Sequence, residues 1–347
     1  MIRIKTQLGG GYSMLLGRGL SDNIAELIKK ENIGDIKRIM IVSDTNVFPL
    51  YGEKFKNNLK SDGYKVYDFV FPAGEHSKKA ATVDRLWEKL GENAFTKNDL
   101  LIALGGGVTG DITGFAAATY LMGIRFIQLP TTLLSMCDST IGGRNVITLN
   151  RSKTLAGTLW HPALIVCDTA FLDTLPEEIF NDGMAEAIKF AMTGSDEIYD
   201  LVMNDEPDIE KIIAMAAYEK KEKLESGNED KISTLWFSYT AADAVEALSN
   251  FSISRGRAIA TGMLIVTKAA AEKKLCDPDT VNILISMLKK HGLPTETIYT
   301  PYDVADFTIT EKRRDGDIIN IVIPERMGKC IIKKINISNY EKFFKKA

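Results

Sequence analysis

Residues 100–144 read LLIALGGGVTGDITGFAAATYLMGIRFIQLPTTLLSMCDSTIGGR, and this stretch decides the fold. It begins with an apolar run of strand length, Leu100–Leu104, which stops at Gly105–Gly107. A helix of small residues is predicted over Phe115–Leu121, and a second strand over Arg125–Leu129. A strand that ends in glycines and passes into a helix places free backbone N–H groups beside the positive end of the helix dipole. The stretch therefore predicts a site for a phosphate or pyrophosphate.

The same alternation of strands and helices extends on both sides of this stretch, with Ser21 as the candidate N-cap of the first helix. Strands are predicted at Ile2–Leu8, Tyr12–Leu16, Arg38–Val42, Lys65–Phe71 and Ala163–Val166, and helices at Ser21–Lys30, Phe55–Leu59 and Thr82–Leu90. Elements that alternate at this spacing predict a mostly parallel sheet with helices on both faces.

The pattern changes near Leu175–Pro176, where strand signals give way to helical periodicity. Helices are predicted at Pro176–Thr193, Asp208–Leu224, Thr240–Ser249, Gly256–Glu272 and Thr280–Lys290, with late strands at Ile318–Ile323 and Lys329–Ile337. A chain of 347 residues is long enough for two cores. We therefore expect an α/β domain over residues 1–175 and an all-α domain over residues 176–347.

Composition narrows the class of protein. The net charge is −3 and the two signs are interspersed, which argues against nucleic-acid or anionic-membrane partners. We found no apolar run near the roughly 20 residues that a membrane-spanning helix needs, and no signal-peptide pattern, so we expect a cytoplasmic protein. The three histidines, His76, His161 and His291, have no zinc-ligand spacing, and the four cysteines are scattered.

Several polar residues follow the predicted strands and have two interpretations each. Asp44 could accept hydrogen bonds from a ribose or cap a helix, and Asp111 could contact a ligand or cap the helix after the glycines. Glu75 and Lys78 lie on a loop that could bind a ligand or be solvated surface. Thr131 and Thr132 could cap the next helix or bind a nucleotide.

A set of charged residues flanks the opening stretch. Asp138 lies in an otherwise uncharged run, which favours burial beside a partner. Arg144 and Lys153 suit a phosphate or carboxylate, or are surface charges. Glu186 and Lys189 share a helix face, and a simple ion pair is the alternative to a catalytic role.

At these residues the chain resembles the 3-dehydroquinate synthases and the wider sugar phosphate cyclase family. The motifs are GGGVTGDITGFAAATY, RFIQLPTTLLSMCDSTIGGR and FLDTLPEEIFNDGMAEAIKF, with PAGEHSK upstream. The resemblance implies a Rossmann-like domain, a helical domain, a homodimer, and a reaction in which NAD transiently oxidises a phosphorylated sugar acid that a divalent metal holds. The NAD-binding residues that it implies are Asp44, Glu75, Lys78, Gly106, Gly107, Asp111, Thr131, Thr132 and Asp138.

The second half departs from the family pattern at the metal. The family's ligands are a glutamate, here Glu186, and histidines of the motifs NFGHTxGHAIE and HGEAVAIGM. Tyr239 and Arg255 stand at those two histidine positions, and Asp243 replaces a further active-site histidine. Met122 and Ile232 replace arginines, Arg144 replaces a lysine, and Lys312 or Arg313 aligns with a C-terminal lysine. A zinc site needs three protein ligands, and one carboxylate does not supply them.

Three functions remain open on this basis. The first is an NAD-dependent enzyme with a remodelled, metal-free site. In it Lys153, Lys189, Arg144, Arg255 and Arg257 hold the anions of a phosphorylated or acidic sugar-like substrate, Arg255 and Arg257 can also neutralise Glu186, and Asp243 or Tyr239 is the acid or base. The second is a non-catalytic NAD-binding homologue with a partner or regulatory role. The third is a 3-dehydroquinate synthase whose metal has moved onto oxygen ligands such as Glu186 and Asp243.

Overall fold

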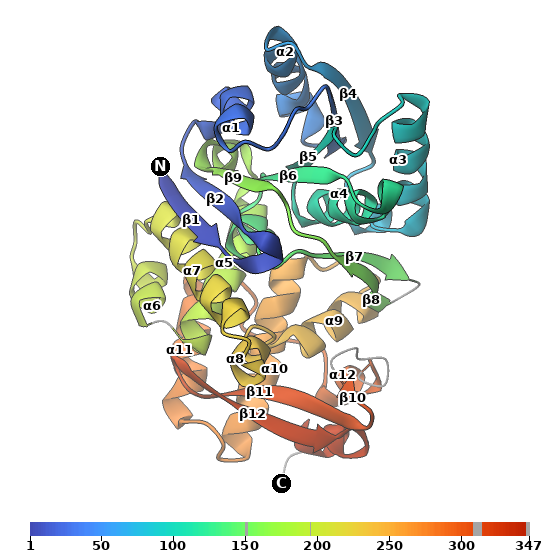
Figure 1. The fold of residues 1–347 in the computed structure, drawn as a ribbon. Coiled ribbons are helices and arrows are strands. Elements are labelled where there is room, and N and C mark those ends of the chain that lie inside the picture. The colour runs from blue at the N-terminus through green and yellow to red at the C-terminus, as the bar shows by residue number, and fades with distance from the viewer. Residues whose placement is uncertain (150–151, 195, 308–313, 345–347) are drawn as a thin grey trace. The chain divides into compact units, whose positions relative to one another are not determined.

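The computed structural model describes residues 1–149, 152–194, 196–307 and 314–344. The chain divides into two compact units, Met1–Leu175 and Pro176–Ala347. The first is an α/β unit and the second is mainly helical (Figure 1).

The first unit is built on a seven-stranded sheet of order β1-β2-β9-β6-β5-β3-β4. Its strands are β1 Ile2–Thr6, β2 Tyr12–Gly17, β3 Arg38–Asp44, β4 Lys65–Phe71, β5 Leu100–Gly105, β6 Arg125–Pro130 and β9 Leu164–Asp168. The pair β1–β2 is antiparallel and every other pair is parallel. The predicted Rossmann-like α/β fold is confirmed.

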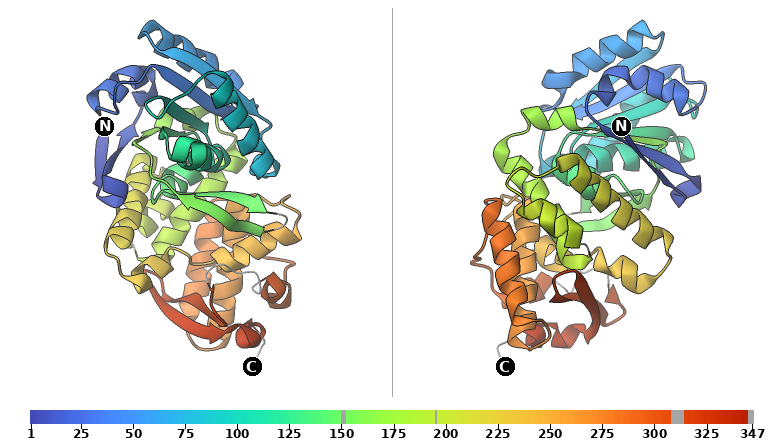
Figure 2. Two further views of the ribbon diagram at one scale, coloured as in Figure 1. Left: turned by 45° about the vertical axis from the view of Figure 1, so that its right-hand side comes forward. Right: turned by 90° about the vertical axis from the view of Figure 1, so that its left-hand side faces the viewer.

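Helices cover both faces of this sheet. They are α1 Ile24–Lys30, α2 Glu53–Ser61, α3 Ala80–Glu92 and α4 Gly107–Thr119. One core joins Val42 and Phe71 of the strands to Leu86 of α3 and Ile112 of α4. Successive strand residues point to opposite faces, and α1 and α2 lie across the sheet from α3 and α4 (Figure 2).

The strand register brings the polar strand ends to one edge. Asp44 pairs with Phe71 at the ends of β3 and β4, and Gly105 pairs with Pro130 at the ends of β5 and β6. After β4 the chain crosses to the other side of β3 to form β5, so the strand order reverses between β3 and β5. Ligands of open α/β sheets bind at such a reversal, outside the carboxyl ends of the strands.

A two-stranded antiparallel hairpin, β7 Arg144–Leu149 and β8 Ser152–Leu159, was not predicted. It packs on α4, and that contact explains a glycine in the helix. A Cβ built on Gly114 would stand 1.8 Å from the Oδ1 atom of Asn145 on β7. The glycine at position 114 therefore serves the close approach of α4 to the hairpin.

Two local predictions in this unit are wrong. The helix expected at Phe115–Leu121 begins earlier, at Gly107, and ends at Thr119, because Leu121 and Met122 take left-handed φ values of 51° and 61°. Ser21 is not an N-cap, since α1 begins at Ile24 after a short 3₁₀ turn. The Ser21 N–H instead donates to Asp168 Oδ2 at 2.8 Å.

The second unit contains helices α5 Glu177–Thr193, α6 Asp196–Met203, α7 Ile209–Glu225, α8 Glu229–Thr234, α9 Tyr239–Leu248, α10 Arg255–Glu272, α11 Pro278–Lys290, α12 Pro301–Phe307 and α13 Tyr340–Phe344. The five predicted helices appear as α5, α7, α9, α10 and α11, whereas the short helices α6, α8, α12 and α13 were missed. The two late strands appear as β11 Ile318–Arg326 and β12 Lys329–Asn336, which form a small sheet with β10 Arg314–Asp315. The unit is helical as expected, with this sheet added to it.

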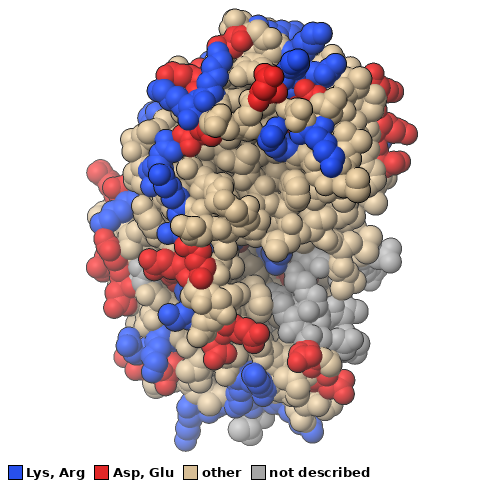
Figure 3. Space-filling view, in the orientation of Figure 1, with Lys and Arg blue, Asp and Glu red and all other residues tan. Residues whose placement is uncertain are grey.

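Surface charges of both signs lie side by side on the face drawn in Figure 3.

Within the described ranges, none of the helices combines the length and the apolar character required to span a membrane. Cys137, Cys167 and Cys276 are buried free thiols, as their scattered positions suggested.

Candidate functional site

Polar side chains and glycines gather at the carboxyl ends of the parallel strands of the first unit, and we call this group the edge cluster. Its members are Asp44, Glu75, Lys78, Gly106, Gly107, Asp111, Thr131 and Thr132. They come from the ends of β3, β4, β5 and β6 and from the first turns of α4. The sheet register thus brings together residues that are up to about 90 positions apart in the sequence.

The glycines form a close-packed turn at the start of α4. Gly106 is the N-cap residue and Gly107 is the first residue of the helix. A Cβ on Gly106 would stand 3.1 Å from Thr132 Cγ2, and one on Gly107 would stand 3.3 Å from Ser139 Oγ. The first-turn N–H groups of a helix have no partner within it, so this turn can donate to a diphosphate.

Asp44 holds the loop that follows β3. Its Oδ1 accepts from the N–H groups of Asn46 at 2.9 Å and Val47 at 3.1 Å, and its Oδ2 lies 3.3 Å from Thr109 Oγ1. The helix-cap alternative for Asp44 is wrong, because the next helical segment, Phe48–Gly52, begins after Val47 without a side-chain cap. Contact with a ribose stays a prediction.

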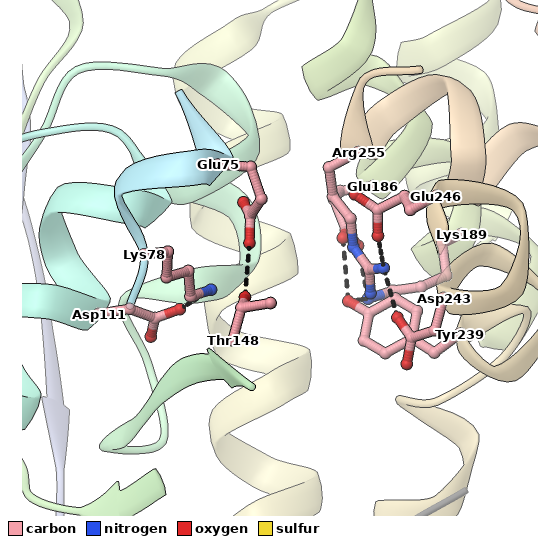
Figure 4. A network of polar contacts seen from close by, with 10 residues as sticks. All are labelled: Glu75, Lys78, Asp111, Thr148, Glu186, Lys189, Tyr239, Asp243, Glu246 and Arg255. Carbon is pink, nitrogen blue, oxygen red and sulfur yellow. Dashed lines mark hydrogen bonds and ion pairs between the residues drawn. The ribbon is translucent and has the colours of Figure 1, made fainter. Parts of the chain in front are cut away.

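Lys78 and Asp111 form an ion pair, drawn at the left of Figure 4. Burial lowers the pKa of Lys78, but attraction to Asp111 and Glu75 outweighs it and raises the pKa above its usual value. Glu75 Oε1 accepts from Thr148 Oγ1 at 3.3 Å. Asp111 is the fifth residue of α4, so the proposal that it caps this helix is wrong.

The remaining predicted cofactor residues lie after β6. Thr132 Oγ1 accepts from the Ser135 N–H at 3.3 Å, which is the capping interaction foreseen for it. Thr131 is buried, and its N–H donates to Gly105 O at 3.1 Å. Asp138 is buried in the π-helical turn Ser135–Ser139, as its uncharged surroundings predicted.

Taken together, the edge cluster has the donor and acceptor set that a dinucleotide requires. Free helix N–H groups suit the diphosphate, the Asp44 carboxylate suits a ribose diol, and Lys78 supplies a cation. A Cβ at Gly106 or Gly107 would require Thr132 or Ser139 to move by a few tenths of an ångström, so the turn is tightly packed.

A second group, the buried cluster, lies in the helical unit. Its members are Glu186 and Lys189 on α5, Tyr239, Asp243 and Glu246 on α9, and Arg255 on α10 (right of Figure 4). Glycines let these helices approach one another. A Cβ on Gly256 would stand 2.2 Å from Asp182 O, and one on Gly262 would stand 2.7 Å from Ser238 O.

Glu186, Lys189 and Tyr239 form a closed set of contacts. Lys189 Nζ donates to the Tyr239 hydroxyl at 2.8 Å, and that hydroxyl donates to Glu186 Oε1 at 2.9 Å. Glu186 Oε2 lies 2.5 Å from Lys189 Nζ in an ion pair. The side chains of Lys189 and Glu186 are 0% and 1% exposed, so the ion pair is internal. The ion pair predicted from their helical spacing is confirmed.

Arg255 pairs with the two carboxylates of α9. Its Nη1 donates to Asp243 Oδ1 and to Glu246 Oε2, each at 2.6 Å. Burial lowers the pKa of Arg255, but attraction to Glu246 and Asp243 is stronger and raises the pKa well above its usual value. The expectation that Arg255 neutralises Glu186 is wrong, because Lys189 does so.

Arg257 does not neutralise Glu186 either. Its Nη2 lies 3.1 Å from Glu178 and its Nε 3.7 Å from Asp182. Burial raises the pKa of Asp182, and Arg257 opposes that shift only in part.

Glu186, Tyr239 and Arg255, which align with the metal ligands of the family motifs, lie close together, but their side chains do not fit a metal ion. Glu186 and Tyr239 are hydrogen-bonded, and Arg255 Cζ lies 4.7 Å from the Tyr239 ring centroid. One carboxylate, one neutral phenol and one guanidinium do not make the three-ligand set of a zinc site. Searched over the described residues, the structure holds no group of three His, Cys, Asp or Glu side chains that could bind a metal ion.

The other predicted anion-binding residues lie on the hairpin of the first unit. Arg144 is exposed on β7, and Lys153 belongs to β8, where it pairs with Thr148. The Lys153 side chain lies outside what the structure describes, as do Lys312 and Arg313.

Two residues with clear roles escaped the sequence analysis. Glu246 has the spacing of a helix pair with Asp243, three residues earlier, and that signal could have identified it as a partner of Arg255. Thr148 contacts Glu75 and carried no signal, because the hairpin itself was not predicted.

Comparisons with known proteins agree with this architecture. The family model of the 3-dehydroquinate synthase N-terminal region matches residues 68–182, and that of the 3-dehydroquinate synthase C-terminal region matches residues 183–314. A 3-dehydroquinate synthase of Clostridium acetobutylicum is 33% identical, with 99% of each chain covered. One of Clostridium perfringens is 35% identical, covering 95% of this chain and 97% of that protein.

Solved structures of cyclases share the fold. A 2-deoxy-scyllo-inosose synthase, solved with carbaglucose-6-phosphate, NAD⁺ and Co²⁺, superposes with a TM-score of 0.86 at 21% identity, covering 99% of each chain. A 2-epi-5-epi-valiolone synthase of Streptomyces hygroscopicus, solved with NAD⁺ and Zn²⁺, gives 0.84 at 23% identity, covering 96% of this chain and 95% of that one.

Proposed function

This chain belongs to the 3-dehydroquinate synthase family, and from that premise we propose that it is an NAD-dependent, carbon–oxygen lyase-type sugar phosphate cyclase homologue with a remodelled site that works without a divalent metal. Its substrate would be a phosphorylated or acidic sugar-like molecule. Residues 1–175 would bind NAD, and residues 176–347 would bind the substrate.

The observation that carries this proposal is the edge cluster. The glycine turn at Gly106–Gly107, the Asp44 loop and the Lys78–Asp111 pair together supply donors for a diphosphate and an acceptor for a ribose. NAD, when bound, would accept a hydride from a secondary alcohol of the substrate. The chain's own groups would orient the cofactor and hold the proton of that alcohol, for which Tyr239 and Asp243 are the candidates.

Arg144 and Lys153 would bind the phosphate or carboxylate of the substrate. Lys189 and Arg255 were candidates for the same task, but each already has a carboxylate within 2.6 Å. Arg144 is exposed and carries a fork suited to phosphate or carboxylate.

Assembly and location complete the proposal. We propose a cytoplasmic homodimer. Exposed apolar side chains of the first unit support a subunit interface, with Met122 85%, Leu159 72% and Leu155 52% exposed.

The decisive test combines metal analysis with turnover. Purified protein is assayed for bound metal, for NAD binding by calorimetry, and for phosphate release and NADH formation with heptulosonate phosphate and other sugar acids. We expect NAD binding without stoichiometric metal, and NADH from at least one polyol or sugar acid. Stoichiometric metal with phosphate release would show an ordinary 3-dehydroquinate synthase.

The second candidate is a non-catalytic NAD-binding homologue. Its specific support is the internal pairing of the buried cluster. Tyr239 joins Lys189 to Glu186, and Arg255 pairs with Asp243, so these charges already have partners within the protein. NAD binding with no turnover of any substrate would favour it.

A further inference from the structure

Two cations of the buried cluster lie against one aromatic ring. Lys189 Nζ is 4.6 Å from the Tyr239 ring centroid, and Arg255 Cζ is 4.7 Å from it. Both distances are within the range of cation–π attraction. The Tyr239 ring therefore contacts two cations at once.

Each cation is fixed by a separate acidic partner. Glu186 lies 2.5 Å from Lys189 Nζ, and Asp243 and Glu246 each lie 2.6 Å from Arg255 Nη1. Glu186, Lys189 and Glu246 are almost completely buried, and a buried charge cannot leave its partner without a large desolvation penalty. The two cations are therefore permanent parts of the unit.

These contacts leave Glu186 unable to act as a ligand. Its Oε1 accepts the Tyr239 hydroxyl at 2.9 Å, and its Oε2 faces the Lys189 ammonium. A divalent ion on this carboxylate would have to displace the Tyr239 hydroxyl from Oε1, and it would be repelled by Arg255, whose side chain does not deprotonate.

We infer that Lys189 and Arg255, which both contact the Tyr239 ring, form a cation pair that occupies the position of a divalent metal ion, and that Tyr239 and Arg255 are the side chains that keep a metal out. This inference deepens the proposed function and rests on it for the claim that the pair belongs to an active site. It predicts a protein whose properties do not change with chelators.

The test restores ligands where the excluding side chains stand. The double variant Tyr239→His/Arg255→His offers two imidazoles beside Glu186, a three-ligand set that suits Zn²⁺ or Co²⁺. The matched control, Tyr239→Phe/Arg255→Gln, removes the same two groups and leaves Asp243 and Glu246 equally unpaired. Co²⁺ binding is measured by calorimetry and by the visible absorption of tetrahedral Co²⁺, with circular dichroism to establish folding.

We expect no Co²⁺ binding by the unaltered protein or the control, and one equivalent bound by the double-histidine variant. One equivalent bound by the unaltered protein would overturn the inference, and that measurement stands even where a variant does not fold. A folded double-histidine variant that binds no Co²⁺ would overturn the role of Tyr239 and Arg255. None of these outcomes depends on turnover. Loss of the proposed function would instead appear as absence of NAD binding in the unaltered protein.

Discussion

The edge cluster and the buried cluster are both polar, but they differ in what their groups bind. At the edge of the sheet, loops and a helix N-terminus present backbone N–H groups, and Asp44, Glu75 and Asp111 remain partly exposed. In the helical unit, three carboxylates and two cations bind one another, and Glu186, Lys189 and Glu246 among them are buried. The first arrangement is built to receive a ligand, whereas the second already satisfies itself.

The difference shows how each kind of site tolerates change. Side chains at the strand ends contact solvent, so a single one of them can be substituted without leaving a buried charge unpaired. Buried charges cannot, because an unpaired one is strongly destabilising. Asp243 and Arg255 both stand where the family motifs carry histidine, and they form a 2.6 Å ion pair, so these two replacements compensate each other's charge. These two positions of the buried cluster therefore depend on each other.

The largest expected effect tests the internal pairing of the buried cluster. Lys189→Met removes the cation that pairs with Glu186 and leaves this carboxylate buried and uncompensated. We therefore expect the free energy of unfolding to fall by about 3–5 kcal/mol. Urea denaturation measures it. The double variant Glu186→Gln/Lys189→Met should recover most of the loss, and an equal loss in single and double variants would refute the pairing.

A smaller effect is expected from the hydroxyl that joins this pair. Tyr239→Phe keeps the ring beside both cations but removes a hydrogen bond from Lys189 and one to Glu186. Leaving two buried groups short of a partner should cost about 1–3 kcal/mol in urea denaturation. Tyr218→Phe, on an exposed tyrosine, is the matched control and should be neutral.

The edge cluster should respond in binding. Asp111→Ala removes the carboxylate that holds Lys78, and we expect NAD affinity to fall on the order of tenfold, or about 1.4 kcal/mol. Isothermal calorimetry measures it, with Asp111→Asn as a control that keeps the shape. Unchanged affinity in the alanine variant would remove Asp111 from the cofactor site.

The smallest expected effect is a change of folding stability with pH, to which each unit contributes one buried histidine. Burial lowers the pKa of His161 in the first unit and of His291 in the second, below the usual 6.5. Below that value the unfolded chain binds more protons than the folded one. Stability should therefore fall by up to about 1 kcal/mol as the pH drops from about 7.5 to about 5.5.

Thermal unfolding across this range measures the slope. His291 Nε2 lies 2.9 Å from Val202 O, so His291→Gln keeps an N–H donor without a titrating group and should flatten the second unit's share of the slope. An unchanged slope would show that His291 does not contribute to it.

The sequence by itself determined the alternation of strands and helices, the change of character near Pro176 and the glycine turn after β5. These are local signals, since hydrophobic periodicity and glycine backbone freedom depend on neighbouring residues. The hairpin β7–β8 and the short helices α6, α8, α12 and α13 carried too weak a local pattern to be found.

Only the tertiary structure decided which charges pair. The sequence offered two kinds of partner for Glu186, namely Lys189 on the same helix and the arginines Arg255 and Arg257. In the folded unit, Glu186 forms an ion pair with Lys189 and a hydrogen bond with Tyr239. Arg255 forms ion pairs with Asp243 and Glu246. The physical reason is that ion pairing depends on distances of a few ångströms between helices, and those distances are set by packing at Gly256 and Gly262, far from any signal in a single segment.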